Sequence, residues 1–331
     1  MNIAAVINVA PGQAALSHAT RTQNLLLEHL GPRLGSIRLA VPRLLKLACL
    51  GAIAEKPDVL VVAGGPRAAR RAGQIAYAHR LPILFLPGHR SPRWTRRLWG
   101  SLSLEGMVTA LAQGAVTPLH LPAGMAGGHI FFGNAICGFL PQIRQLRDDL
   151  ADVETVAAAA RLLAGAAAAC GLVFGPRIAI RCHGASRKAS AIVIGTQGSE
   201  PAARDAGVAR LGSFTCTAWR QGTLSLARAS LRAAAGGDWQ SEQNPECFSC
   251  TTLHLHAGRK TWLLLDGEAI ALRGPVELRY LPRTVKTFAF ASDRATSGSR
   301  LYNSFLNAQN KPWNPGPLSH VRISGRDWTG A

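Results

Sequence analysis

The first third of the chain alternates short, almost wholly apolar runs with amphipathic stretches. The apolar runs predict β-strands over residues 3–8, 36–41, 58–63 and 82–87, and the stretches between them predict helices over 18–30, 43–54 and 68–79. Strands that are apolar throughout and are separated by helices are typical of a parallel sheet covered on both faces. The pattern predicts an α/β, Rossmann-like domain over residues 1–115.

From about Val116 the pattern changes to short strands separated by turn residues, with helical interruptions over roughly 141–171 and 222–235. The expected strands are 116–122, 129–135, 177–184, 189–196, 211–219, 248–257, 260–268, 276–282 and 285–290. This pattern predicts a second domain, an antiparallel β-sandwich over residues 116–290. The remaining residues, 291–331, are polar and rich in Gly, Pro, Ser and Asn, which predicts a loosely ordered tail.

Three loops follow the predicted parallel strands, at Asn8 to Gly12, Gly64–Gly65 and Pro87–Gly88. Ligands of such sheets bind beyond the carboxyl ends of the strands, so these loops are expected along one rim. Their convergence predicts a nucleotide-type site.

The charge balance points to anionic partners. The 331 residues include 37 Lys and Arg but 18 Asp and Glu, a formal net charge of +19. Such a charge favours phosphates on nucleic acid, nucleotides or anionic lipid, although a solvated basic surface explains it equally well. We expect a cytoplasmic protein. The first residues predict a β-strand rather than a signal peptide, and seven cysteines without regular spacing do not predict a disulfide scaffold. Arg161 interrupts the most apolar segment, 155–175, which therefore predicts a packed helix rather than a membrane span.

Several motifs, in order, are similar to those of one family. They are VINVAPG, DVLVVAGG, LPILFLPG, RRLWGSLSLEGMVTALAQGAVTPLHL, GGHIFFGNAICGF and LLLDGEAIALRGPVELRYLPRTVKTFAF. Over residues 3–290 the chain resembles the diacylglycerol kinase catalytic-domain family, which includes bacterial lipid kinases and sphingosine kinases. The resemblance implies an α/β domain that binds ATP with Mg²⁺, a β-sandwich that binds lipid, and phosphoryl transfer in the cleft between them.

The resemblance also implies site residues. Asp266 matches the Asp of the family's Asp-Gly-Glu block, which implies a general base that takes the proton of a lipid hydroxyl. A common Asp-Gly turn is the other interpretation of this pair, and Glu268 is expected to be a supporting or surface group. The residues expected to shape the nucleotide site are Asn8, Gly12, Gly64, Gly65, Arg67 and Gly88.

The chain departs from the family in its loops. Pro66, Arg67 and Ala68 replace the last three residues of a GGDGT-like loop, and in the 89–95 loop only the preceding Gly88 matches. Val9 and Leu140 also replace a proline and an acidic residue. Proline removes a backbone N–H donor for phosphate, and no nearby carboxylate replaces the aspartate that would help to hold Mg²⁺. Nucleotide binding therefore survives these changes more readily than phosphoryl transfer. Arg67, Arg70, Arg90 and Arg93 could hold a phosphate without metal.

Three other interpretations stay open. The first is a catalytically impaired relative that binds lipid, an anion or a partner protein, and the second is a basic nucleic-acid-binding module. The third places Trp94, Trp99 and the arginines between them on an anionic membrane surface. Cys247, Cys250, His254 and His256 suggest a zinc site, but an extended strand does not bring four such ligands together, and a polar sheet face explains them better.

Overall fold

The computed structural model describes residues 1–88, 95, 98, 102–138, 141, 178–196, 212–219 and 246–290. Residues 1–294 form one compact unit. Most of the expected helices over 141–171 and 222–235, most of the 89–95 loop with Arg90 and Arg93, and the 291–331 tail lie outside the described residues.

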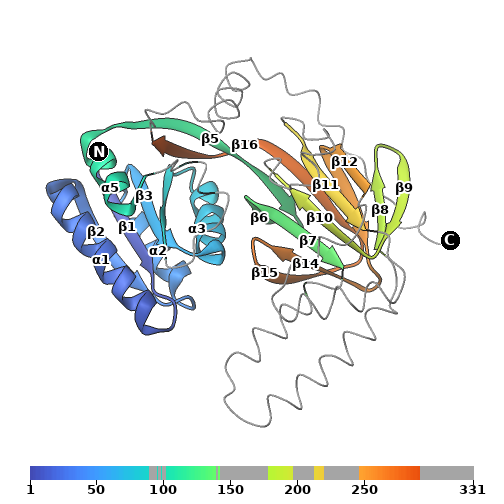
Figure 1. The fold of residues 1–331 in the computed structure, drawn as a ribbon, viewed down its shortest axis with the longest axis horizontal. Helices are drawn as coiled ribbons and strands as arrows, with labels where there is room; N and C mark the ends of the chain where they lie inside the picture. The colour runs from blue at the N-terminus through green and yellow to red at the C-terminus, as the bar shows by residue number, and fades with distance from the viewer. Residues whose placement is uncertain are drawn as a thin grey trace, which may run out of the picture. The chain divides into compact units, whose positions relative to one another are not determined.

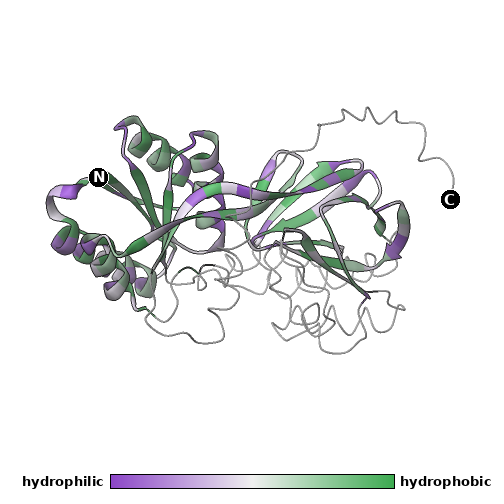
Figure 2. Ribbon diagram, turned by 90° about the horizontal axis from the view of Figure 1, so that it is seen from above, coloured by the Kyte–Doolittle hydropathy of each residue, from purple (hydrophilic) through white to green (hydrophobic). Residues whose placement is uncertain are grey.

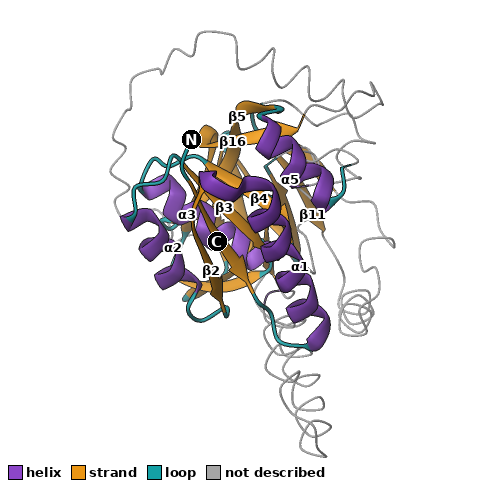
Figure 3. Cartoon of the chain, turned by 90° about the vertical axis from the view of Figure 1, so that its left-hand side faces the viewer, coloured by secondary structure: helices purple, strands orange, loops and turns teal. Residues whose placement is uncertain are grey.

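The first half is a three-layer α/β arrangement. The strands are β1 (Ile3–Asn8), β2 (Leu34–Ala40), β3 (Val59–Gly64) and β4 (Ile83–Pro87), and in the described residues they form a parallel sheet of order β2-β1-β3-β4. The helices are α1 (Gln13–Leu30), α2 (Leu45–Ala54), α3 (Pro66–Ala78) and α5 (Leu104–Gln113), with a 3₁₀ turn η1 (Gly31–Arg33). Figure 3 shows α1 and α5 on one face of this sheet and α2 and α3 on the other.

The apolar strands form because helices cover both faces of the sheet. Every residue of β3 is buried, as are all residues of β1 except Asn8. The strands and helices that the sequence predicts in this half are confirmed to within a few residues, and β1 matches the expected range at both ends. Helix α1 begins five residues earlier than expected, at Gln13.

The second half is an antiparallel sandwich, as the sequence predicts. Its strands are β5 (Val116–Ala126), β6 (His129–Phe131), β7 (Asn134–Gly138), β8 (Ile178–Cys182), β9 (Ala185–Ala189), β10 (Ala191–Gly195), β11 (Phe214–Trp219), β12 (Glu246–Cys250), β13 (Thr252–His256), β14 (Lys260–Leu265), β15 (Glu268–Arg273) and β16 (Val276–Phe290). In the described residues one sheet has the order β6-β5-β16-β13-β8-β9, and the other has the order β12-β11-β10-β7-β14-β15.

The inward-facing side chains of the two sheets form one apolar core. Phe131, Phe214, Ile192, Leu253 and Leu263 are among its fully buried members. Figure 2 shows hydrophobic residues concentrated along the strands of both halves. Alternation of buried and half-buried positions, as in β13, is the pattern expected of a sheet with one face on the core.

Two strands differ from the sequence prediction. The apolar run over 248–257 is not one strand, because the chain turns at Thr251 and crosses from β12 in one sheet to β13 in the other. Cys250 and His254 therefore do not share one sheet face, contrary to the expectation. The two closing strands expected after residue 275 are one continuous strand, β16, with a register shift between Leu281 and Val285.

The long ribbon of β5 and β16 links the two halves (Figure 1). The first part of β16 pairs with β13 in the sandwich, and farther along the strand the buried Thr287 hydroxyl donates to the Ile83 carbonyl of β4 (2.6 Å). The rings of Phe85 in β4 and Phe132, which follows β6, lie 6.1 Å apart. Because these contacts cross residue 115, the expected boundary between 1–115 and 116–290 stays a prediction.

Candidate functional site

The strand order of the parallel sheet has its switch point between the two central strands. The connections from β1 to β2 and from β2 to β3 leave β1 and β3 side by side in the centre, which is where the direction of strand order reverses. Ligands of open α/β sheets bind outside the carboxyl ends of the strands at this point. Asn8 ends β1 and Gly64 ends β3, so both lie at the switch point.

Three of the residues expected to shape a nucleotide site pack against one another at this rim. A Cβ added to Gly64 would lie 3.2 Å from the Cβ of Asn8, and one added to Gly88 would lie 2.7 Å from the backbone of Gly64. These two glycines therefore allow the ends of β1, β3 and β4 to approach closely. Asn8 Oδ1 is buried and has no hydrogen-bond donor among the described residues.

Gly12 and Gly65 are the N-cap residues of α1 and α3, and both helices begin at the same rim. Neither cap supplies a side-chain hydrogen bond, and neither first turn contains an acidic residue. Gly12 has a φ of 108°, a conformation that favours glycine, and a Cβ there would meet open space. Uncapped backbone N–H groups at a helix N-terminus attract anions, although Pro66 supplies none in α3.

Asp266 lies in the tight turn between β14 and β15, with φ values of 46° at Asp266 and 85° at Gly267. Its carboxylate is buried and accepts three backbone hydrogen bonds from the segment that joins β6 to β7. Phe132 N–H donates to Oδ2 (2.7 Å), and Gly133 and Asn134 N–H donate to Oδ1 (2.8 and 3.0 Å). Asp266 and Gly267 therefore form a tight turn, and the Asp266 side chain also holds a second loop in place.

Burial raises the pKa of Asp266 to about 6, although the three backbone N–H groups and the nearby Arg70 act in the opposite direction. An ionised carboxylate has about four lone-pair sites, and the three amides occupy three of them. One site on Oδ2 is not used by any donor of the described residues. By this count one acceptor site on Oδ2 remains, and the raised pKa makes Asp266 more basic than an ordinary aspartate.

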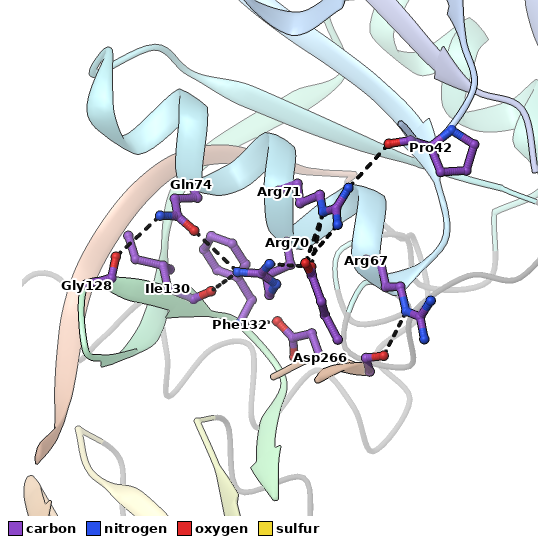
Figure 4. Close-up of polar contacts among 11 residues, drawn as sticks. Pro42, Arg67, Arg70, Arg71, Gln74, Gly128, Ile130, Phe132 and Asp266 are labelled. Carbon is purple, nitrogen blue, oxygen red and sulfur yellow. Dashed lines mark hydrogen bonds and ion pairs between the residues drawn. The ribbon is translucent and has the colours of Figure 1, made fainter. Parts of the chain in front are cut away.

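The turn that carries Asp266 is bound to one face of α3 (Figure 4). Arg67 Nε donates to the Gly267 carbonyl (2.8 Å), and both Arg70 and Arg71 form ion pairs with Glu268. Arg70 is almost wholly buried and also donates to the Ile130 carbonyl (3.4 Å). Asp266 is therefore held against the helix that follows Gly64 and Gly65.

Glu268 is a supporting group, one of the two alternatives that the sequence left open. Burial raises its pKa, but the hydrogen bonds and charges of Arg71 and Arg70 outweigh burial, so the net shift of the pKa is downward. Sequence reasoning missed this network and treated Arg67 and Arg70 only as phosphate ligands. The signal was their spacing, because residues 67, 70 and 71 share one helical face.

The described residues contain no group of three or more His, Cys, Asp or Glu side chains arranged to hold a metal ion. Asp266 and Glu268 already accept hydrogen bonds from amides and arginines. The two cysteines and two histidines considered for zinc lie on strands of different sheets. A protein cage for Mg²⁺ therefore does not fit the side chains that the structure describes.

No protein-family model matches the chain, and no curated protein matches it either. Solved structures do. A diacylglycerol kinase from Bacillus anthracis strain Sterne has a TM-score of 0.54 at 11% identity, over 88% of this chain and 97% of that one. The chain has a diacylglycerol kinase fold. Two further structures from the same organism, both of presumed diacylglycerol kinases, are also similar. One has a TM-score of 0.57 at 13% identity, over 88% of this chain and 96% of that one. The other has a TM-score of 0.58 at 12% identity, over 88% of this chain and 99% of that one.

Proposed function

We propose that the chain is a lipid-kinase-type phosphotransferase that moves a phosphoryl group from ATP to the hydroxyl of a lipid such as diacylglycerol. One observation carries the proposal. The turn with Asp266 is bound by Arg67, Arg70 and Arg71 to the first half of α3, directly after the glycines at the switch point. A basic carboxylate and an anion-attracting helix terminus are thereby brought to one place.

Asp266 is the proton acceptor in this proposal. The lipid hydroxyl occupies the remaining lone-pair site on Oδ2, and its proton passes to Asp266 as its oxygen bonds to the γ-phosphorus and the bond to ADP breaks. A pKa of about 6 keeps the group ionised at pH 7 while making it a better base than a solvated aspartate. The three amides fix the carboxylate, so no reorganisation is needed on substrate binding.

The ATP phosphates fit the uncapped N-termini of α1 and α3. Backbone N–H groups after Gly12 and Gly65 supply hydrogen bonds, and the guanidinium of Arg67 adds positive charge. The buried Asn8 Oδ1 at the same rim accepts a hydrogen bond from the ligand or its bound water. We assign no residue to Mg²⁺, because the described carboxylates are already engaged.

A second candidate is binding of nucleotide or another anion together with lipid, without transfer. Pro66 favours it, because the loop lacks one backbone donor and no carboxylate replaces the aspartate of a GGDGT-like loop. In this function the Asp266 turn is purely structural, and Arg67 binds phosphate without metal.

Radiolabelled ATP with Mg²⁺ and diacylglycerol dispersed in detergent micelles separates these candidates. Labelled lipid that falls at least about 100-fold in Asp266→Asn supports the kinase, because a positioned base contributes about 10²–10⁴-fold. Glu277→Gln is the matched control, since Glu277 forms an exposed ion pair with Arg279. Circular dichroism shows that each variant is folded.

The other outcomes are equally informative. Lipid and nucleotide retention without label supports the binding function and contradicts the kinase. Salt-sensitive retention of an oligonucleotide without lipid binding supports the nucleic-acid module instead. If only the triple variant Pro66→Asp, Arg67→Gly and Ala68→Thr makes labelled lipid, the loop is the cause of inactivity.

A further inference from the structure

The end of β2 and the start of α2 carry a cluster of exposed hydrophobic side chains, residues 39–47, which we call the β2–α2 tip. Most large hydrophobic side chains of the parallel sheet are buried, but the tip exposes Leu39 (50%), Val41 (50%), Leu44 (52%) and Leu47 (66%). Half of the large exposed hydrophobic residues identified in the described part of the chain thus fall within nine consecutive positions. Apolar exposure of this density marks an interaction surface.

The charge of the tip is wholly basic. Arg43 and Lys46 are exposed between the hydrophobic side chains, and residues 34–54 include no Asp or Glu. The nearest acidic residue in the sequence, Glu55, is engaged by Arg38 (2.5 Å). Apolar side chains interleaved with cations match the boundary between anionic headgroups and acyl chains.

The tip is joined to the candidate site. Arg71 Nη1 donates to the Pro42 carbonyl (3.3 Å) in the middle of the tip, and the same guanidinium binds Glu268 (Figure 4). The tip also begins at the carboxyl end of β2, the rim at which β1 and β3 end. A surface bound by the tip therefore lies beside the turn that carries Asp266.

We propose that the β2–α2 tip docks the protein on an anionic membrane surface. Leu44 and Leu47 enter the boundary between headgroups and acyl chains, and Arg43 and Lys46 bind lipid phosphates. The described residues contain no helix long and apolar enough to cross a membrane. The net charge of +19 draws the whole chain to the same surface. Docking does not require phosphoryl transfer and goes beyond the proposed function.

Sedimentation with vesicles of phosphatidylcholine, with and without phosphatidylglycerol, tests the docking. The wild type is expected to bind the anionic vesicles, and Leu44→Asp with Leu47→Asp is expected to weaken binding at least tenfold. Arg43→Glu with Lys46→Glu removes the preference for phosphatidylglycerol. The matched control changes Leu16 and Leu27 to Asp, because these leucines of α1 are equally exposed (54% and 50%) but lie elsewhere. The control is expected to bind like the wild type.

Three results overturn the proposal: a wild type that does not sediment, a tip variant that sediments unchanged, or a control that weakens as much as the tip variant. A wild-type dimer that the tip substitutions convert to monomer, without vesicle binding, assigns the surface to a second copy instead. Thermal unfolding verifies that all three variants are folded. Labelled-lipid formation in detergent micelles is independent of docking, so a failure of either proposal is recognised separately.

Discussion

The β14–β15 turn and the β3–α3 turn lie against each other and use their polar groups in opposite ways. In the first turn the polar groups already have partners. Asp266 accepts hydrogen bonds from three backbone N–H groups, the Gly267 carbonyl accepts one from Arg67, and Glu268 forms ion pairs with two arginines. In the second turn the helix N-terminus has no side-chain cap, and the first turn of the helix contains no acidic residue. The first turn is a built support, whereas the second is open to an anion. The difference places the structural support in the back half and the uncapped backbone donors in the front half.

The largest effect is expected from Asp266→Ala, which removes the acceptor of three buried N–H groups. The loss of folding free energy is expected to be about 4 kcal/mol, because each buried donor without a partner costs roughly 1–3 kcal/mol. Asp266→Asn keeps an acceptor oxygen and is expected to lose about half as much. Urea denaturation measures both. A loss below about 1 kcal/mol for the Ala variant would contradict the idea that this turn is a built support.

Glu268→Ala comes next, with an expected loss of about 3 kcal/mol, because the buried Arg70 is left with an uncompensated charge. The control is Glu277→Ala, whose exposed pair with Arg279 is expected to contribute less than about 1 kcal/mol. Equal losses from the two substitutions in urea denaturation would show that Glu268 does not fasten α3 to the turn.

Gly88→Ala tests the rim of the parallel sheet. The added Cβ would meet the Gly64 backbone, which cannot rotate away, so an expected loss of about 2 kcal/mol follows from overpacking. Gly51→Ala in α2 is the control, because its Cβ meets only the flexible Arg38 side chain, and it is expected to be neutral or stabilising by up to about 1 kcal/mol. Thermal unfolding distinguishes the two variants.

The smallest expected effect concerns pH. Asp266 must be deprotonated to accept a proton, so kcat/KM of lipid phosphorylation is expected to fall below about pH 6 as the group becomes protonated. The fall approaches about tenfold for each pH unit, equivalent to about 1.4 kcal/mol. A profile that stays flat down to pH 5 would exclude Asp266 as the base.

Local patterns of apolar and polar residues in the sequence were sufficient to predict most of the strands and helices of the parallel sheet. Strand β1 has the limits that its apolar run predicts, because both of its faces are covered by helices. Strand β9 was missed, since Ala185–Ala189 is a mostly exposed edge strand with few apolar residues. The corner at Thr251 was missed because β12 and β13 have the same apolar character, and only their partners in three dimensions separate them.

The site was predicted less completely than the fold. The order of motifs identified Asp266 and the glycines, and their roles in catalysis and nucleotide binding stay predictions. The partners of Asp266 are backbone N–H groups of residues 132–134, which every sequence contains and no side-chain pattern marks. The pairing of Glu268 with two arginines nearly 200 residues away likewise depends on the packing of α3 against the β14–β15 turn.

Strand β16 runs through both halves of the molecule. Near its start it pairs with β13, and farther along it is hydrogen-bonded to β4 through Thr287. Its one irregularity lies between Leu281 and Val285, at Pro282, where the ladder to β5 is interrupted. Because the ladder between β16 and β5 is interrupted there, a rotation of the parallel sheet relative to the sandwich costs least at this point of the strand.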